Sequence, residues 1–223
     1  MYNKYDNYIF DLYGTLVDIH TDEESLELWT NMAGKLKDEY GANYEAKELR
    51  TTYLKLCKEE EKDLQSKNHA EYPEIKIERV WAKLISNKIN EKVAPASLED
   101  LCIYFREESR DKFTLYKDTM NLINGLRKDG KKVFLLSNAQ RFFTEKELDE
   151  TGLTPCFDDI FISSDKGVKK PQKEFLEELI KSNNLEPSRC VMIGNETFSD
   201  GGVAEKNGVD AIIVKDGDFS DIG

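Results

Sequence analysis

Several apolar runs of this 223-residue chain end in side chains that can do chemistry. They are a carboxylate at Asp11, a hydroxyl and an amide at Ser137 and Asn138, an amide and a carboxylate at Asn195 and Asp200, and an ammonium group at Lys170, just before Pro171. Buried strands of a parallel sheet have the composition of such runs, and open α/β sheets bind ligands where the carboxyl ends of the strands meet. We therefore expect these side chains to converge on one site.

The stretch YIFDLYGTLVD, residues 8–18, predicts a nucleophile at Asp11. Gly14 allows the chain to turn sharply, which aims backbone N–H groups at an anion in front of the carboxylate. A carboxylate that attacks phosphorus or an sp³ carbon forms a covalent ester and divides one displacement into two easier steps. The stretch thus predicts covalent chemistry on a small anionic substrate, with Tyr13 at the position where many such sites carry a second acid.

The polar residues at the other strand ends could assist a displacement by the Asp11 carboxylate. The Ser137 hydroxyl can donate to a transferring group, and Lys170, before a proline that fixes the helix start, can neutralise developing charge. Asp200 and Asp11 together can hold a magnesium ion. Simpler interpretations stay open, because Ser137 and Asn138 also suit a helix cap and Asp200 before a glycine suits a turn.

The order of apolar segments predicts an α/β fold. Five short runs rich in β-branched or aromatic residues indicate buried parallel strands, namely YIFDLY, KVFLLSN, DIFISS, CVMIGN and DAIIVK. Helical patterns lie between the last four runs, and several end in Gly or Asn, as left-handed caps do. Alternating strands and helices predict a Rossmann-like, doubly wound parallel sheet.

About a hundred residues separate the first strand from the second, and apolar residues recur there at spacings of three and four, as on amphipathic helices. We therefore expect an α/β core domain of residues 1–18 and 116–223 and an α-helical cap domain of residues 19–115, inserted after the first strand. Four aromatic residues at helical spacings are assigned to the core of the insertion and not to substrate contacts: Trp29, Tyr53, Trp81 and Phe105.

The composition limits the partners. A formal net charge of −12 would repel phosphate backbones, so we expect no nucleic-acid partner. The chain is 39% hydrophobic and 34% charged, and no apolar run approaches the roughly 20 residues that cross a bilayer, so we expect no membrane association. The N-terminal MYNKYDNY lacks the apolar centre of a signal peptide, which predicts a cytoplasmic protein. The sequence does not indicate an oligomeric state.

Four motifs in order resemble those of the haloacid dehalogenase (HAD) superfamily of hydrolases with a helical cap: FDLYGTL, LLSN, KKP and GNETFSD. Each motif is weak alone, but together they cover essentially the whole chain. The resemblance implies that Asp11, Tyr13, Ser137 and Lys170 are catalytic, that Thr15, Ser137, Asn138 and Lys170 bind substrate, and that Asp11, the Tyr13 carbonyl, Asn195 and Asp200 hold a magnesium ion.

Two positions depart from the pattern of the phosphatases in this superfamily. These phosphatases have an acid two residues after the nucleophile, and that residue is Tyr13 here. They usually have two carboxylates in the fourth motif, and the first is Asn195 here. Loss of a positioned general acid or base costs about 10² to 10⁴ in rate. Magnesium often binds through one or two carboxylates plus substrate phosphate, so the metal site is weakened but still plausible.

The segment D-x-Y-G-T-L is also similar to the first motif of the L-2-haloacid dehalogenases, in which the nucleophile displaces halide without a metal. Those enzymes use an arginine early in the cap; Arg50 is the nearest here, but its surroundings differ. The resemblance therefore implies a hydrolase that acts on a small anionic metabolite through an aspartyl ester. A magnesium-dependent phosphatase is favoured over a metal-independent 2-haloacid dehalogenase, and a third alternative is a catalytically weakened ligand-binding or regulatory protein.

Overall fold

The computed structural model describes residues 4–222, whose contacts divide the chain into two compact units. The core unit comprises the chain up to Ile19, the segment Ala70–Glu74 and the chain from Phe113 onward, and the helical unit comprises His20–His69 and Ile75–Lys112. The predicted domain boundaries, after residue 18 and before residue 116, stay a prediction. No sequence pattern indicated that Ala70–Glu74, in the middle of the insertion, groups with the core unit.

The core unit is built on a five-stranded parallel sheet, which confirms the predicted α/β fold class. Its strands are β1 (Asn7–Phe10), β4 (Lys132–Ser137), β5 (Asp159–Ile162), β6 (Cys190–Gly194) and β7 (Asp210–Ile213). They lie in the order β5-β4-β1-β6-β7, so the chain builds the sheet outward from β1 in one direction and then returns to build the other side. The carboxyl end of β1 is therefore the point where the strand order reverses, which is where such sheets bind ligands.

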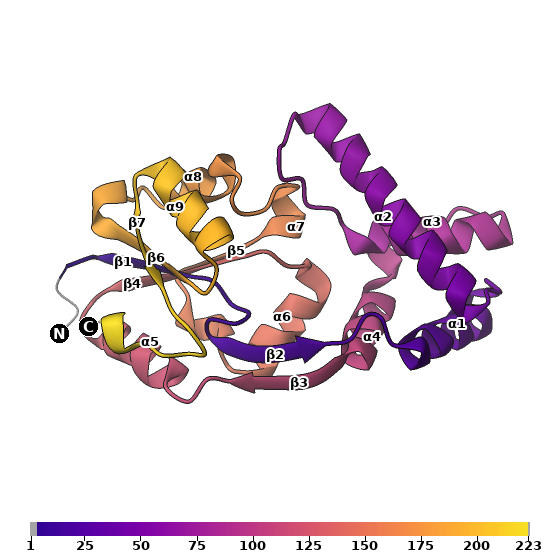
Figure 1. Cartoon of the computed structure of the whole chain (residues 1–223), viewed down its shortest axis with the longest axis horizontal. Helices are drawn as coiled ribbons and strands as arrows, with labels where there is room; N and C mark the ends of the chain where they lie inside the picture. The colour runs from indigo at the N-terminus through magenta and orange to yellow at the C-terminus, as the bar shows by residue number, and fades with distance from the viewer. Residues whose placement is uncertain (1–3, 223) are drawn as a thin grey trace. The chain divides into compact units, whose positions relative to one another are not determined.

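Helices cover both faces of this sheet (Figure 1). On one face lie α5 (Thr119–Lys128) and α6 (Arg141–Glu150), and on the other lie α8 (Lys173–Ser182) and α9 (Gly202–Asn207). A short helix, α7 (Ser163–Lys166), follows β5. Short 3₁₀ turns are present at Pro95–Ser97, Thr154–Cys156, Pro187–Arg189 and Ser220–Ile222.

Alternate residues of the three central strands, β1, β4 and β6, pack into two separate hydrophobic clusters. Tyr8 and Phe10 of β1 pack with the α5 side, whereas Ile9 between them packs with the α8 side. This alternation follows from the two-residue period of a strand. Because both faces are covered, every residue of β1 is buried, and the first polar side chain after the strand is Asp11.

The helical unit contains four helices, namely α1 (Leu26–Tyr40), α2 (Ala46–Asn68), α3 (Ile77–Ile89) and α4 (Glu99–Ser109). Its first helix has clear end signals. The Ser25 side chain accepts a hydrogen bond from the Leu28 backbone N–H, and Gly41 ends the helix in the left-handed conformation. These are the preferred residue types for the two caps.

One aromatic residue from each of these helices forms the centre of the helical unit. The ring centroids of Trp29, Tyr53, Trp81 and Phe105 lie 4.8–6.3 Å apart. All four side chains are buried, as the sequence predicted for core residues. Aromatic pairs at these separations stabilise a core beyond the area that they bury.

A two-stranded sheet of β2 (Val17–Thr21) and β3 (Arg110–Leu115) was not predicted. The sequence predicted helices across the insertion, but α4 ends at Ser109 and β3 follows it directly. Both strands are short and mostly not buried, and each carries only two alternating apolar residues, Val17 and Ile19 in β2 and Phe113 and Leu115 in β3. A pattern of this kind does not distinguish a strand from the end of a helix.

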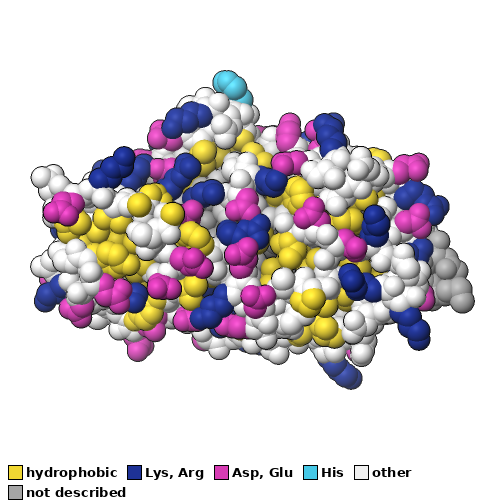
Figure 2. All heavy atoms as spheres, turned by 180° about the vertical axis from the view of Figure 1, so that it is seen from behind, with side chains coloured by type: hydrophobic (Ala, Val, Ile, Leu, Met, Phe, Trp, Pro, Cys, Tyr) yellow, Lys and Arg dark blue, Asp and Glu magenta, His cyan; other side chains and the backbone are white. Residues whose placement is uncertain are grey.

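The surface in Figure 2 carries Lys and Arg side chains among Asp and Glu side chains, so charges of both signs are mixed on that face. Across residues 4–222, no helix is both long enough and apolar enough to cross a membrane.

The aromatic centre predicts a large effect for Trp81→Ala. Removing a fully buried indole leaves a cavity among the other three rings, and we expect a loss of about 3–5 kcal/mol in the free energy of unfolding. Urea denaturation followed by circular dichroism measures it. The exposed Leu54 on α2 gives a control, since Leu54→Ala should change the free energy by no more than about 0.5 kcal/mol. Equal effects of the two substitutions would contradict this role.

Candidate active site

A buried lysine joins two carboxylates at the carboxyl end of the sheet. Lys170 Nζ donates hydrogen bonds to Asp11 Oδ1 and to Asp200 Oδ1, each at 2.7 Å. Asp11 directly follows β1, and Asp200 lies in the turn after the neighbouring strand β6. The order of the strands therefore brings together two carboxylates that are 189 positions apart in sequence (200 − 11).

These three groups are almost completely removed from water. The side chains of Lys170 and Asp200 are each 1% exposed and that of Asp11 is 10% exposed. Burial raises the pKa of Asp11, and the neighbouring Lys170 charge opposes this shift without cancelling it. Burial lowers the pKa of Lys170, but the charges of Asp11 and Asp200 outweigh burial, so the net shift is upward. The lysine is thus held in its charged form by the carboxylates that it joins.

The loop after Asp11 is held by a hydroxyl and an amide. Thr15 Oγ1 lies 3.1 Å from Asp11 Oδ2 and 3.3 Å from Asn195 Oδ1. Gly14 has a φ of +78°, and a Cβ at this position would overlap the Asn195 amide. Glycine is therefore required both by the backbone conformation and by the close approach of Asn195.

A π-helical turn, η4 (Thr197–Gly201), presents Asp200 to the lysine. The Glu196 backbone N–H donates to Asp200 Oδ2 at 3.0 Å, and the Asp200 N–H donates to the Glu196 carbonyl at 2.9 Å. A Cβ at Gly194 would overlap the Asp200 carboxyl group. Turns of this kind are frequent at functional sites, and here the turn fixes one carboxylate against the end of β6.

Asn138 holds the backbone of Lys170. Its Oδ1 accepts the Lys170 N–H at 2.8 Å, and its Nδ2 donates to the Lys170 carbonyl at 3.1 Å. This paired contact orients the residue whose side chain reaches both carboxylates. Ser137 is fully buried at the end of β4, and its hydroxyl has no hydrogen-bond partner within residues 4–222. A buried hydroxyl without a partner is costly, which is consistent with a ligand that supplies one.

The Tyr13 hydroxyl is engaged with α6. It donates a hydrogen bond to Glu147 Oε2 and lies 3.1 Å from Thr144 Oγ1. Glu147 is 3% exposed, so its carboxylate is a buried partner of the tyrosine. Glu147 was not predicted from the sequence, because 134 residues separate it from Tyr13 and helix α6 has no local feature that marks it.

A pocket of about 160 Å³ lies over these groups. Six predicted site residues line it, namely Asp11, Tyr13, Asn138, Lys170, Asn195 and Asp200. Glu196 and Ser199 also line it and were not predicted, although both belong to the motif GNETFSD. Thr15 and Ser137 do not line it. The pocket is smaller than the roughly 300–1,000 Å³ of a typical ligand site, so it suits the reacting group of a substrate.

The oxygen ligands in this pocket fit a magnesium ion. Each oxygen of Asp11 and Asp200 already accepts a side-chain or backbone hydrogen bond, from Lys170, Thr15 or the Glu196 backbone, and a carboxylate oxygen has two acceptor positions. Residues 4–222 contain no group of three His, Cys, Asp or Glu side chains placed to hold a metal. A magnesium ion would therefore depend on two carboxylates and neutral oxygens, a set that magnesium accepts when a substrate phosphate completes it.

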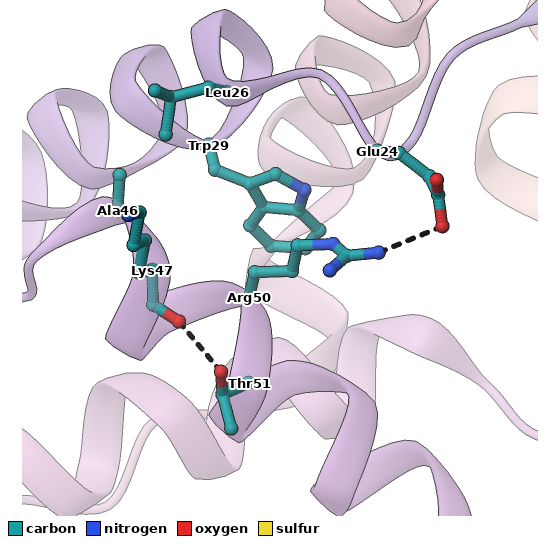
Figure 3. Close-up of a pocket in the computed structure, with 7 residues that line it drawn as sticks. All are labelled: Glu24, Leu26, Trp29, Ala46, Lys47, Arg50 and Thr51. Atoms are coloured by element: carbon teal, nitrogen blue, oxygen red, sulfur yellow. Dashed lines mark hydrogen bonds and ion pairs between the residues drawn. The ribbon is translucent and has the colours of Figure 1, made fainter.

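Arg50 lies in a separate pocket of about 370 Å³ within the helical unit. Figure 3 shows its side chain running beside the Trp29 indole toward Glu24. Its Nη2 lies 3.0 Å from Glu24 Oε1, and the Glu24 side chain is 87% exposed. The positive charge of Arg50 is thus compensated by a surface ion pair within its own unit.

A family model of haloacid dehalogenase-like hydrolases matches residues 5–201, which is most of the chain and includes every predicted site residue. The chain belongs to this family. The expected resemblance to HAD hydrolases is therefore confirmed, and the enzyme class is that of a hydrolase.

Two curated relatives of this HAD-like chain are a phosphatase and a nucleotidase by name. A glyceraldehyde 3-phosphate phosphatase from Methanothermobacter thermautotrophicus is 28% identical over 44% of this chain and 44% of its own length. A pyrimidine 5'-nucleotidase, YjjG of Escherichia coli, is 32% identical over 36% of each chain. The matches thus span less than half the length of these relatives.

Solved structures share the fold of this HAD-like chain at low identity. The protein YfnB from Bacillus subtilis, in a crystal form bound to magnesium, is 19% identical with a TM-score of 0.55, and the match covers 95% of this chain and 89% of that one. L-2-haloacid dehalogenase from Xanthobacter autotrophicus is 18% identical with a TM-score of 0.54, over 94% and 77%. Both a magnesium-bound protein and a dehalogenase therefore share the architecture.

Because Lys170 joins the carboxylates of Asp11 and Asp200, we expect Lys170→Met to lower the free energy of unfolding by an amount that depends on pH. Without the ammonium group, two buried carboxylates face each other, so their pKa values in the folded state rise above the unfolded value. Folding must then either bury uncompensated charge or bind a proton. The loss of unfolding free energy should therefore be small near pH 4 and grow as the pH rises, to about 3–5 kcal/mol at pH 8.

Urea unfolding at pH 5 and pH 8 measures this dependence. Lys181→Met is the matched control, because Lys181 is 70% exposed and pairs with Glu177 on the surface. Its effect should stay below about 1 kcal/mol at both pH values. A Lys170→Met effect that is equal at the two pH values would show that the carboxylates do not depend on the lysine.

Proposed function

We propose that this HAD-like hydrolase is a magnesium-dependent phosphatase that acts on a small phosphorylated metabolite through an ester on Asp11. The observation that carries the proposal is the bridge from Asp11 through Lys170 to Asp200 in a pocket sized for one reacting group. It combines a carboxylate nucleophile, a fixed positive charge and a second carboxylate beside the Asn195 amide. The names of the curated relatives, a phosphatase and a nucleotidase, favour phosphoryl transfer over displacement of halide.

The proposed reaction has two displacements. In the first, an oxygen of Asp11 attacks phosphorus, the bond from phosphorus to the substrate oxygen breaks, and that oxygen takes a proton from solvent water because position 13 carries no acid; Lys170 stabilises the charge on the phosphoryl oxygens. In the second, water attacks the same phosphorus and gives up its proton to solvent, Asp11 departs as a carboxylate, and inorganic phosphate is released. Thr15 would keep Asp11 oriented for the attack. The Ser137 hydroxyl does not line the pocket in the free protein, and it would donate to a phosphoryl oxygen once the substrate is bound.

Asp11, Asp200, the Asn195 amide and the Tyr13 carbonyl are the oxygens that would hold the magnesium ion. When bound, the ion neutralises part of the charge on the phosphoryl group. This assignment is supported by the spare acceptor positions on each carboxylate and by the magnesium-bound relative in fold.

A specific observation favours 2-haloacid dehalogenation as a second candidate. The Tyr13 hydroxyl is committed to Glu147, so position 13 presents no carboxylic acid to a leaving oxygen. A halide leaves without a proton and needs none. The motif around Asp11 and the fold shared with a dehalogenase agree with this candidate.

A substrate panel separates the two candidates. We expect phosphate release from small phosphate esters, including a triose phosphate and pyrimidine nucleoside monophosphates, in the presence of magnesium, and loss of that release on chelation. Halide release from 2-chloropropionate should stay at background. Asp11→Asn should lower phosphate release by roughly 10³-fold or more, because the nucleophile is lost.

Asp63→Asn is the control for the same chemical change at an exposed position of α2. It should leave phosphate release unaltered. Chelator-resistant halide release that depends on Asp11 would replace the phosphatase with the dehalogenase. Turnover that survives Asp11→Asn would exclude both.

Restoring an acid at position 13 tests how far the missing group limits the reaction. Tyr13→Asp should raise the phosphatase kcat by up to about 10²-fold, since a positioned acid typically contributes 10² to 10⁴. The new carboxylate would lie near buried Glu147, so the substitution is made both alone and together with Glu147→Gln, which removes the like charge. No gain in either background would favour a native reaction that needs no acid at this position.

A further inference from the structure

The segment Ala70–Glu74, between α2 and α3, is docked on the loop that carries Lys170. We call it the strap. The Tyr72 carbonyl accepts the Lys169 N–H at 3.0 Å, and the Glu74 N–H donates to the Gly167 carbonyl at 3.0 Å. Pro73 and Val168 form an antiparallel bridge between these contacts. The strap therefore pairs with the Lys170 loop through the backbone, although about a hundred residues separate them in sequence.

Gln172 fastens the strap from the other side of Lys170. Its Oε1 accepts the backbone N–H groups of Glu71 and Tyr72, both at 3.1 Å. Its Nε2 donates to Glu174 Oε2 at 2.6 Å, which fixes the direction of the amide. One side-chain oxygen thus satisfies two strap amides, and Lys170 lies between the two points where the strap is attached.

Glu74 extends the attachment to two more loops at the same edge of the sheet. Its Oε2 accepts from Ser163 Oγ at 2.9 Å, and its Oε1 accepts from Gln140 Nε2 at 3.2 Å. Ser163 begins the helix after β5, and Gln140 follows Asn138 in the loop after β4. The strap therefore contacts both the loop that carries Asn138 and the loop that carries Lys170.

An aromatic contact completes the docking. The ring of Tyr72 meets the ring of Phe198 edge to face, with centroids 5.8 Å apart. Lys206 Nζ lies 5.2 Å from the Tyr72 ring centroid and donates to the Pro171 carbonyl at 2.9 Å. Phe198 belongs to η4, the turn that presents Asp200. The strap therefore also contacts the turn that carries the second carboxylate bound to Lys170.

We propose that the strap positions Lys170 for the reaction and that Gln172 is the positioning residue that latches it. The inference rests on the proposed function, in which Lys170 stabilises charge on the transferring group. Lys170 is held at its own backbone by Asn138, and the strap holds the residues on both sides of it. Small displacements matter at such a site, because a shift of about 1 Å in a catalytic group can cost 10²-fold in rate.

The test compares two substitutions at Gln172. Gln172→Met removes the acceptor for both strap amides, and we expect faster hydrogen exchange at Glu71, Tyr72 and Lys169. We expect kcat for phosphate release to fall by about 10- to 100-fold, with KM changed much less. The double variant Gln172→Glu with Glu174→Gln exchanges the two side chains. The carboxylate at position 172 still accepts from the strap amides, and the amide at position 174 donates to that carboxylate. It should retain exchange rates and kcat close to those of the wild type.

Hydrogen exchange reports on the attachment of the strap, and kinetics report on its effect on Lys170. Faster strap exchange with an unaltered kcat, or no change in exchange at all, would overturn the proposal. If the wild type hydrolyses no phosphate ester, the proposed function fails, and exchange at the Lys169 and Lys170 amides still decides whether the strap positions this loop. If Gln172→Met left hydrogen exchange at the Lys169 and Lys170 amides unaltered, the positioning role of the strap would be rejected.

Two further variants protect the comparison. Gln172→Asn keeps a polar amide but is too short to reach the strap. If Gln172→Met folds poorly, Gln172→Asn replaces it in the test and should show the same faster exchange and lower kcat. Gln65→Met makes the same change at an exposed position of α2 and should alter neither exchange in the strap nor kcat. If Gln65→Met lowered kcat as much as Gln172→Met, the proposal that Gln172 positions Lys170 through the strap would be contradicted.

Discussion

The site depends on one buried ammonium group that faces two buried carboxylates. Neither Asp11 nor Asp200 is exposed enough to rely on water for its charge, so Lys170 must remain in place. The residues around Lys170 hold all three groups in place. Gly194 makes room for one carboxylate, Thr15 holds the other, and Asn138 orients the lysine backbone. These contacts come from different strand ends, so the parallel sheet is what makes the arrangement possible.

The neutral residues at positions 13 and 195 change the balance of charge. With all groups ionised, Asp11, Glu196, Asp200 and Lys170 give the pocket lining a net charge of −2, whereas acids at both positions would make it −4. A site with fewer carboxylates attracts a divalent cation less strongly and repels an anionic substrate less. Tyr13 and Asn195 also have structural partners, Glu147 and Thr15, so the two departures fit their surroundings.

The sequence predicted the parts of the fold that follow a regular period. The five apolar runs became the five strands of the parallel sheet, although β7, at one edge, is mostly exposed and not buried as predicted. Asp11, Lys170 and Asp200 met where strand ends in a doubly wound sheet must meet. What it missed depends on contacts between distant segments. Glu147 has an ordinary helical neighbourhood, and nothing near Ala70–Glu74 indicates that it groups with the core unit. The strands β2 and β3 each have only two alternating apolar residues, which is too short a pattern to identify a strand.

The strap has a consequence for how such an insertion can be exchanged during evolution. The chain passes between the two units near residues 19, 69, 74 and 112, and not only at the two ends of the insertion. A graft that replaced the whole insertion with that of a relative would also replace the residues that pair with the Lys170 loop. The insertion is therefore not an independent module, because one segment of it belongs to the core unit.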